Sequence, residues 1–456
     1  TRYSYDQSGK LIETCRTNGS KEKRTYDAAG QLIRIQDSTA QGIMLQQFRL
    51  TYNEIGQIIQ EEDKQYTYDK LRRLSSGAFK GRIVSYEYDL GGNLTLTRDS
   101  LEGNASSFRY TSDNRLHALG DYPVEMDADG NLLYKSNGES MASYEYDARN
   151  RLVKSGKARY TYNMLGNRTS MSWRGKTTQY VVDDLGELSR VLMELDEEGT
   201  PKAYYVYGLG LIGREDADGS YLSYHSDIRG STTLLTDETG RVTDRYTYGI
   251  YGELEQHEGS TSQPFQYNGR DGVMTDPNGL YYMRARYYDP ELKRFLNRDV
   301  ILGDLTDGQT LNRYAYVNGD PVGYVDPLGL FKCEGLGETG TVWDSIKGTQ
   351  PAYDGTVIPR SFEITVGNQN VWVHGNGTKH IYEEVAKKMK VPGIDPKYYS
   401  QLLLDDFSGT LQQVTKNGIK YDELITVGKW EFKLSPPRLD GQLPVVKHAQ
   451  FNGWGN

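Results

Sequence analysis

One short phrase recurs about every twenty residues between Tyr5 and Leu188: an aromatic residue, Asp or Asn, two variable residues, Gly, a polar residue and Leu. Clear copies begin at Tyr5, Tyr26, Tyr88 and Tyr146, and more degenerate copies lie between them. Internal repetition of this length indicates stacked structural units that share one continuous core. The repeat therefore constrains the fold more than any other feature of the sequence.

Each copy of the phrase predicts a β-hairpin. Alternation such as Tyr66-Thr67-Tyr68 places aromatic side chains on one face of a strand. The Asp-x-x-Gly that follows supplies a side chain that caps a turn and a glycine that is free to adopt positive φ. The Leu then opens the return strand. We therefore expect a repetitive, mostly β structure over this region.

Composition divides the chain near residue 330. Of the 37 tyrosines, only five follow that residue. The net charge of −9 belongs entirely to the first part, because acidic and basic residues balance after residue 330. A chain of 456 residues is long enough for two or more domains. The net acidity of the repeats argues against a nucleic-acid-binding surface on them.

Several classes of protein are disfavoured by features of the whole chain. No run approaches eighteen apolar residues, so we expect no transmembrane helix. The start shows no secretion signal and opens on Thr1 in mid-repeat, so we expect a fragment of a longer protein. Cys15 and Cys333 lie on opposite sides of the boundary, which disfavours both a disulfide framework and a cysteine-based zinc site.

A segment dense in motifs follows the repeats. Its four parts are Asn278–Pro290, Arg294–Asp299, Asn312–Pro321 and Val325–Leu330, the last of which ends in Asp-Pro-Leu-Gly-Leu. Together with the repeats, over roughly residues 1–330, the chain resembles the C-terminal part of a bacterial Rhs/YD-repeat polymorphic toxin. The resemblance implies a hollow β-shell of YD repeats that encloses a variable C-terminal toxin.

The resemblance and the composition together divide the chain into four parts. We expect a fragment of the YD-repeat β-shell at residues 1–190, a core-associated segment at 191–330, a linker at 331–356 and a toxin domain at 357–456. The expected fold is mostly β, with a small α+β domain after the shell.

Members of the resembled family often cut themselves after an Asp-Pro-x-Gly-Leu motif, with an aspartic dyad and an assisting arginine. By motif, the arginine of Arg-Tyr-Tyr-Asp-Pro is Arg286, and the two aspartates are Asp299 and Asp326. The bond to be cut is then Leu330–Phe331. Two carboxylates close together cannot both ionise, so one stays protonated as an acid while its partner activates water.

This chain departs from the family pattern around the first aspartate. Val300 follows Asp299 where many relatives have proline, and the insert before Asp326 is longer. Both departures bear on the geometry of the dyad. The alternative interpretation is that the two aspartates only cap turns, as aspartate before proline commonly does.

Strands and helices alternate in the tail. Phe362–Val366 and Val371–Val373 have the pattern of two strands, with Gly367-Asn368 as the hairpin turn between them. Apolar residues at helical spacing predict a helix over Ile381–Met389, which Thr378 would cap. The remaining expected elements are a helix at Pro396–Val414 and strands at Leu424–Val427, Trp430–Leu434 and Leu443–His448.

Imidazole and basic side chains gather at the expected junction of strand and helix in the tail. We expect His374, Lys379 and His380 to converge with the N–H groups of the helix start, which suits a phosphate. Two imidazoles can divide the base and acid roles of a transphosphorylation, and a lysine can stabilise the developing charge. Arg438 and His448 are candidates to complete the site. The alternative is that these histidines only form turns or fill the core.

The strings Trp372–His380 and Pro444–His448 carry a second resemblance, to C-terminal nuclease domains of Gram-positive wall-associated Rhs proteins and of some LXG toxins. It implies a metal-independent, cofactor-free ribonuclease, directed at tRNA, with a barnase/EndoU/colicin-like fold and with Asn376 and Thr378 as substrate contacts. The implied partners are RNA, a cognate immunity protein and an upstream Rhs shell. The implied protein is secreted or bound to the cell wall or surface, and its tail acts in the cytoplasm of a target cell.

Other functions stay open for the tail. A metal-dependent His-Asn-His nuclease can be drawn from His374, Asn376 and His380, although their compact spacing differs from the usual layout. An ADP-ribosyltransferase and a YD-repeat adhesin with an inert tail also fit the sequence. A zinc nucleobase deaminase is disfavoured, because it needs a Cys-x-x-Cys pair and the tail has Cys333 alone. The neutral charge of the tail gives no electrostatic support to RNA binding.

Overall fold

The described part of the chain forms two compact units. The computed structural model describes residues 1–7, 9–184, 188–303, 308–330, 332–334, 346–354, 356–366, 369–388, 396–415, 418–437, 439 and 442–452. We call residues 1–303 and 308–334 the shell unit and residues 346–452 the tail unit. Of the helices in these described ranges, none has the length and apolar character needed to cross a membrane.

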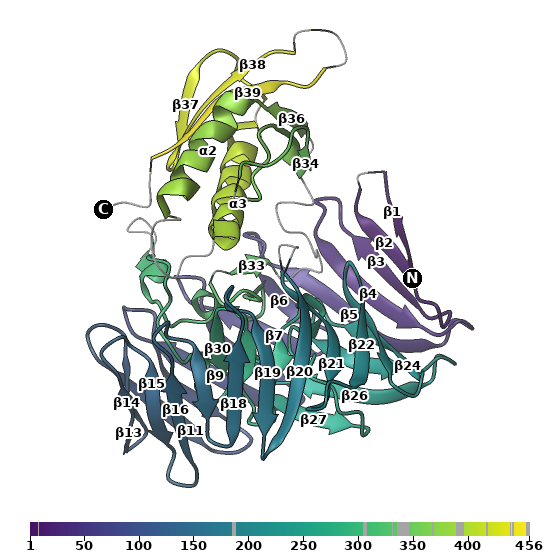
Figure 1. The fold of residues 1–456 in the computed structure, drawn as a ribbon, viewed down its shortest axis with the longest axis vertical. Helices are drawn as coiled ribbons and strands as arrows, with labels where there is room; N and C mark the ends of the chain where they lie inside the picture. Colours follow the sequence, from purple (N-terminus) through teal and green to yellow (C-terminus); the bar gives the residue numbers. More distant parts are fainter. Residues whose placement is uncertain are drawn as a thin grey trace. The chain divides into compact units, whose positions relative to one another are not determined.

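The repeats form two antiparallel sheets, and each strand pairs with the next one in sequence (Figure 1). The first sheet holds β1 (Arg2–Tyr5), β2 (Leu11–Cys15), β3 (Lys21–Tyr26), β4 (Leu32–Ser38), β5 (Met44–Tyr52), β6 (Ile58–Glu61), β7 (Lys64–Tyr68), β8 (Leu74–Phe79), β9 (Arg82–Tyr88), β10 (Leu94–Asp99), β11 (Ala105–Tyr110), β12 (Leu116–Leu119) and β13 (Tyr122–Pro123). This succession of hairpins confirms the prediction of a repetitive β structure.

The second sheet extends beyond the expected end of the repeats at residue 190. It holds β14 (Glu125–Met126), β15 (Leu132–Ser136), β16 (Met141–Tyr146), β17 (Leu152–Ser155), β18 (Ala158–Tyr162), β19 (Arg168–Trp173), β20 (Lys176–Asp183), β21 (Arg190–Leu195), β22 (Pro201–Gly208), β23 (Gly210–Asp216), β24 (Tyr221–Ser226), β25 (Thr232–Thr236), β26 (Val242–Tyr248) and β27 (Leu254–Glu258). The sheet reaches Glu258 because alternating strands and Asp-x-x-Gly turns persist to that point.

One hairpin shows why the repeat has its sequence. Oδ1 of Asp27 accepts the backbone N–H of Gln31 at 2.8 Å, and Gly30 closes the turn with a φ of +85°. The same contact recurs in the copies at Asp69, Asp89, Asp127 and Asp147. The aspartate and the glycine of the repeat are therefore turn-forming residues.

The aromatic residues of the repeat join neighbouring hairpins. The hydroxyl of Tyr68 donates to the carbonyl oxygen of Ile58 at 2.6 Å, and Tyr88 makes the same contact to Leu74 at 2.9 Å. The preceding aromatic residue, such as Tyr66, is buried in the core. Each repeat thus buries aromatic rings, and the hydroxyl of one tyrosine donates to a backbone carbonyl of the preceding repeat. Buried tyrosine hydroxyls usually need such a partner.

The part of the core-associated segment that follows β27 covers the edge of the sheets that carries the Asp-x-x-Gly turns. Its elements are η1 (Gly269–Asp271), β28 (Met274–Thr275), β29 (Tyr281–Met283), β30 (Arg286–Asp289), β31 (Arg294–Phe295), η2 (Gly308–Leu311), η3 (Val317–Gly319) and β32 (Tyr324–Val325). Its side chains donate to carbonyl oxygens of successive turns: Asn312 to Gly91 at 3.1 Å, Arg294 to Asn114 at 2.8 Å and Tyr314 to Gly130 at 3.1 Å. These bonds fix the segment on the repeats.

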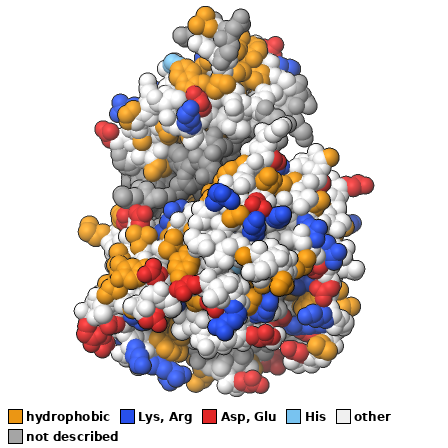
Figure 2. Space-filling view, turned by 90° about the vertical axis from the view of Figure 1, so that its right-hand side faces the viewer, with side chains coloured by type: hydrophobic (Ala, Val, Ile, Leu, Met, Phe, Trp, Pro, Cys, Tyr) orange, Lys and Arg blue, Asp and Glu red, His pale blue; other side chains and the backbone are white. Residues whose placement is uncertain are grey.

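Charged side chains of both signs are interspersed over the face of the shell unit that Figure 2 shows. Within the shell unit, charged side chains form ion pairs between strands, as Arg82 does with Asp99 and with Glu255, each at 2.6 Å. This face therefore carries no extended field of one sign.

The tail unit is a sheet with two helices. The sheet order is β34 (Ile346–Gly348), β35 (Phe362–Val366), β36 (Gln369–Val373), β39 (Val445–Phe451), β38 (Trp430–Ser435) and β37 (Leu424–Val427). Only the pairing of β36 with β39 is parallel among these described strands. The helices are α2 (Gly375–Lys388) and α3 (Pro396–Thr415). The second helix and the strands lie within a few residues of their expected positions.

The first helix of the tail begins earlier than expected. It starts at Gly375, so Thr378 lies inside the helix and the prediction that Thr378 caps it is wrong. His374 is the cap instead, since its Nδ1 accepts the N–H of Asn376 at 3.1 Å. The glycines predicted a turn, but α2 packs on β39, and a Cβ built on Gly377 would lie 3.4 Å from the carbonyl oxygen of Val446. Tertiary packing here overrides the low helix propensity of glycine.

Two short strands lie in the range 331–356 that was expected to be a linker. β33 (Cys333–Glu334) pairs with β32, and β34 pairs with β35. Strands of two or three residues have no period of their own, and they form here because a neighbouring strand offers backbone partners. The expected turn at Gly367-Asn368 lies outside the described residues.

Candidate self-cleavage site and candidate nuclease site

The loop that carries Leu330 is closed by a pair of short strands. β32 and β33 are antiparallel, and Val325 pairs with Cys333, so the described residues 326–330 and 332 lie between the two strands. Phe331, on the far side of the bond expected to be cut, lies outside the described residues. The described residues before and after this bond are therefore tied together by strand pairing.

Main-chain contacts fix the first half of this loop. The N–H of Ala285 donates to the carbonyl of Leu328 at 3.1 Å, and Nη1 of Arg284 donates to the carbonyl of Pro327 at 2.6 Å. Gly329 has a φ of +67°, and a Cβ on it would lie 2.5 Å from the carbonyl oxygen of Met283. The Asp-Pro-Leu-Gly-Leu motif therefore needs glycine at this position for steric reasons.

A single guanidinium group brings the two expected aspartates together. Nη2 of Arg286 lies 2.7 Å from Oδ2 of Asp299 and 3.7 Å from Oδ2 of Asp326. Nε of Arg286 donates to the carbonyl of Gly329 in the loop. All three charged side chains are less than a tenth exposed. The structure thus gathers the residues assigned by resemblance around the segment they are expected to cut.

Each aspartate also braces a turn, but with its other oxygen. Oδ1 of Asp326 accepts the N–H of Leu330 at 3.0 Å, and Oδ1 of Asp299 accepts the N–H of Ile301 at 2.8 Å. The turn-capping interpretation and the dyad interpretation are therefore compatible, because different atoms serve each role. Val300, which replaces the family's proline, leaves Asp299 in contact with the arginine.

Burial sets the electrostatics of the pair. It raises the pKa of Asp299, and the nearby charges of Arg286 and Arg313 oppose that rise. The carbonyl oxygen of Arg313 accepts both the N–H of Asp299 and Nη1 of Arg286, each at 2.9 Å. Burial and the charge of Arg298 lower the pKa of the Arg313 guanidinium. A buried carboxyl with a raised pKa is suited to carry a proton.

Two histidines meet in the tail unit, on α2 and β39. The ring centroids of His380 and His448 are 5.4 Å apart, with an angle of 70° between the ring planes. Nδ1 of His380 lies 3.1 Å from Oε2 of Glu383, and Nζ of Lys379 lies 3.8 Å from Oε1 of the same residue. Burial and the neighbouring His380 lower the pKa of His448, while Glu431 opposes the shift. This pair can exchange protons with a ligand on the surface of the unit.

His374 makes contacts of its own beside this pair. Its Nδ1 is occupied by the N–H of Asn376, and its ring meets the ring of Trp372 edge to face at 5.4 Å. Lys379 and His380 lie in the second turn of α2, because the helix begins at residue 375. His374 thus caps the helix while Lys379 and His380 both approach Glu383, and the joint role of the three residues stays a prediction.

The other expected site residues of the tail differ in accessibility. Asn376 is exposed at the start of α2. Thr378 is fully buried and its hydroxyl donates to the carbonyl of Arg360 at 2.7 Å, so it offers no surface to a substrate. Arg438 lies outside the described residues. Across the described ranges, no three His, Cys, Asp or Glu side chains are grouped so that they could hold a metal ion.

The model of the teneurin YD-shell family matches residues 60–322, more than half of the chain. This chain belongs to the teneurin YD-shell family. The tRNA nuclease WapA of Bacillus subtilis strain 168 is 30% identical to this chain over 302 residues, covering 63% of this chain and 12% of WapA. The double-stranded DNA deaminase toxin A of Burkholderia cenocepacia strain H111 is 27% identical over 395 residues, covering 75% of this chain and 26% of that toxin.

A solved structure also contains this fold. The Photorhabdus luminescens Tc holotoxin pore includes a chain that aligns with 73% of this one, at a TM-score of 0.60 and 20% identity, over 19% of its own length. The family match and the similarity to WapA confirm the resemblance to Rhs/YD-repeat polymorphic toxins. This chain spans only a small part of the length of each of these relatives.

The relatives reported above are named for different chemistries, tRNA cleavage and DNA deamination. The shell therefore does not determine the chemistry of the tail, which depends on the tail's own residues.

Glu383 was missed from the sequence, although its i, i+3 spacing from His380 on a helix was an available signal. Arg313 was also missed; its carbonyl accepts from Asp299 and Arg286, and its Nη2 donates to the carbonyl of Asp299.

Proposed function

We propose that this chain is part of a secreted or surface-bound bacterial toxin whose YD shell cuts the chain after Leu330. In this proposal residues 1–330 form part of a container and the released tail begins at Phe331. The observation that carries the proposal is the position of Arg286, which contacts Asp299 and Asp326 beside the loop that ends in Leu330.

The proposed cleavage is hydrolysis by the dyad. Asp326, as a carboxylate, takes a proton from water while the water oxygen bonds to the carbonyl carbon of Leu330. Asp299, whose pKa burial raises, gives its proton to the departing nitrogen. The C–N bond breaks, leaving a carboxyl group on Leu330 and an amino group on the following residue, and the dyad proton ends on Asp326. Arg286 positions both carboxylates and stabilises the oxyanion.

The tail is proposed to be a ribonuclease that uses the facing rings of His380 and His448. The lowered pKa of His448 keeps it neutral, as a general base requires, so it takes the proton of a ribose 2′-hydroxyl. The 2′-oxygen bonds to phosphorus, the bond from phosphorus to the 5′-oxygen breaks, and His380 gives that oxygen a proton. The products are a 2′,3′-cyclic phosphate and a 5′-hydroxyl. Glu383 orients His380, and Lys379 stabilises charge on the phosphate.

The substrate and partners in this proposal are inferred from the relatives. WapA proteins of three Bacillus strains are named as tRNA nucleases, which supports RNA, and tRNA in particular, as the substrate. A toxin of this kind needs an immunity protein in the cell that makes it, an upstream part of the shell, and a target cell in whose cytoplasm the tail acts. No proposed step uses a metal or a cofactor.

Incubation of the purified full chain with tRNA in EDTA tests the nuclease half. Cleavage that leaves 5′-hydroxyl ends supports the two-histidine chemistry. Cleavage that stops in EDTA favours a metal-dependent His-Asn-His nuclease. Intact RNA under all conditions leaves an ADP-ribosyltransferase or an adhesin with an inert tail, which a radiolabelled NAD assay distinguishes.

A further inference from the structure

Lys332 lies just beyond the proposed cleavage point and contacts the shell. Its Nζ is 4.3 Å from the centroid of the Tyr324 ring, a cation–π contact. The next residues, Cys333 and Glu334, pair with Val325 and Tyr324 as the strand β33. The chain on the C-terminal side of the bond is therefore bound by backbone pairing and by a side-chain contact.

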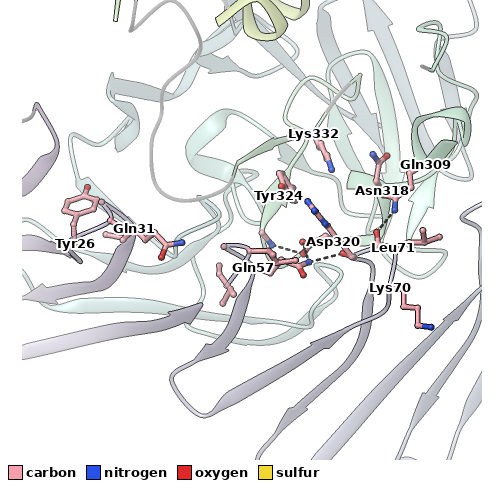
Figure 3. Close-up of a pocket in the computed structure, with 18 residues that line it drawn as sticks. Tyr26, Gln31, Gln57, Lys70, Leu71, Gln309, Asn318, Asp320, Tyr324 and Lys332 are labelled. Atoms are coloured by element: carbon pink, nitrogen blue, oxygen red, sulfur yellow. Dashed lines mark hydrogen bonds between the residues drawn. The ribbon is translucent and has the colours of Figure 1, made fainter. Parts of the chain in front are cut away.

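The Lys332 side chain lies on the wall of a cavity of about 620 Å³ in the shell unit (Figure 3). The wall combines turns of the repeats, including Gln57 and Arg72, with Asp320 and Tyr324 of the core-associated segment. Asp320 is 5% exposed, and its carboxylate accepts the N–H of Gly323 at 3.0 Å. Burial raises the pKa of Asp320, and the charge of Lys332 opposes that rise.

We propose that this cavity is a recognition subsite of the self-cleaving protease, which takes a cationic side chain at the second position after the cut bond. Tyr324 supplies the ring face, Asp320 supplies the opposite charge, and β33 is the substrate strand that adds to β32. This inference rests on the proposed self-cleavage and extends it to the C-terminal side of the bond.

The geometry indicates that this subsite would help to position the peptide bond at the dyad. Every residue of the Asp-Pro-Leu-Gly-Leu motif lies on the N-terminal side of the bond, where Ala285, Arg284 and Arg286 hold it. A peptide bond that is held on one side only can move relative to the dyad. Small displacements of a reacting group greatly lower the rate of reaction. Addition of a substrate strand aligns the backbone, while a pocket for a side chain supplies the specificity. The first residues of the tail thus belong functionally to the container.

Self-cleavage of the full chain during cell-free translation measures the effect. The chain is labelled with methionine, chased, and followed as the ratio of whole chain to two pieces. We expect Lys332→Glu to slow cleavage about three- to thirty-fold and Lys332→Met to slow it less, while Lys332→Arg keeps the wild-type rate. The matched control is Lys157→Glu, the same charge change in the exposed turn between β17 and β18.

A second variant tests the subsite without altering the substrate strand. Asp320→Asn keeps an acceptor for the N–H of Gly323 but removes the charge, and we expect it to slow cleavage as Lys332→Met does. Wild-type rates for both Lys332→Glu and Asp320→Asn would overturn the subsite, as would equal rates for Lys332→Arg and Lys332→Met.

Asp299→Asn separates the inference from the proposal beneath it. If that variant stays whole while the Lys332 variants cleave at the wild-type rate, only the subsite is wrong. If Asp299→Asn still cleaves, or the wild type never does, the self-cleavage proposal fails and the subsite fails with it.

Discussion

Nη2 of Arg286 lies 2.7 Å from Oδ2 of Asp299, where both side chains are less than a tenth exposed. The same nitrogen is 3.7 Å from Oδ2 of Asp326. Removing one member of a buried ion pair leaves an uncompensated charge, so loss of one of these side chains destabilises the fold. Each aspartate braces its own turn through Oδ1, while its Oδ2 faces Arg286.

The first prediction concerns the two carboxylates. Asp299→Asn or Asp326→Asn should give one uncut chain, because asparagine keeps the turn contact but cannot supply or accept the proton. Gel analysis of the purified variants measures this. Asp218→Asn, an exposed turn aspartate, is the matched control and should cleave as the wild type does. Cleavage of both dyad variants would contradict the assignment.

The second prediction concerns the glycine of the motif. Gly329→Ala should block or strongly slow cleavage, because the new Cβ meets the carbonyl of Met283 at a positive φ. Its expected cost in unfolding free energy is about 1–3 kcal/mol, measured by denaturant titration. Gly199→Ala is the matched control: its φ is +85° with no atom within 4 Å of the added Cβ. Gly199→Ala should be destabilised less and should cleave normally.

The third prediction is the pH dependence of cleavage. Because Asp299 has a raised pKa and must carry a proton, the rate should fall as pH rises through its folded pKa. The charge of Arg313 opposes the raised pKa, so Arg313→Gln should move this fall to higher pH. Uncut chain, recovered in denaturant from inclusion bodies and refolded at a series of pH values, gives the profile. An unchanged profile in Arg313→Gln would remove Arg313 from the account.

The fourth prediction concerns the histidine pair. His380→Ala or His448→Ala should lower RNA cleavage about a hundredfold to ten-thousandfold, the usual contribution of a general acid or base. Glu383→Gln should cost less, because it only loosens the orientation of His380. The assay is tRNA cleavage in EDTA. Full activity in the double variant His380→Ala, His448→Ala would abolish the two-histidine site.

The fifth prediction separates His374 from the catalytic pair. His374→Ala should leave tRNA cleavage within a few-fold of the wild type, because its ring caps α2 and contacts Trp372. Loss of the cap should lower the stability of the tail by about 0.5–2 kcal/mol, seen in thermal unfolding. His374→Asn is the matched variant, since asparagine is a good cap and should restore stability. Loss of activity in His374→Asn would return His374 to the site.

The shell could be predicted because its sequence is locally consistent. Asp27, Gly30 and Tyr68 each serve one hairpin or its nearest neighbour, so a period in the sequence is enough to place them. The two aspartates of the dyad were identified by resemblance to family motifs rather than from a periodic pattern in the sequence. The role of Arg313 depends on its contacts with Asp299 and Arg286, which a single sequence does not display, and β33 is too short to show a period.

The tail shows the limit of local reasoning. Glycines around Asn376 predicted a turn, but packing of α2 on β39 drew them into the helix and moved its start to Gly375. That shift placed His374 at the cap and turned His380 toward His448. A change of six residues in the start of one helix therefore changed the partners of every candidate catalytic side chain on it.

Intact mass spectrometry of the purified wild-type chain tests the central claim most directly. The account predicts two polypeptides, of which the smaller begins at Phe331 and the larger ends at Leu330. A single polypeptide with the mass of all 456 residues, from a sample shown to be folded, would contradict the claim that this YD shell releases its own tail.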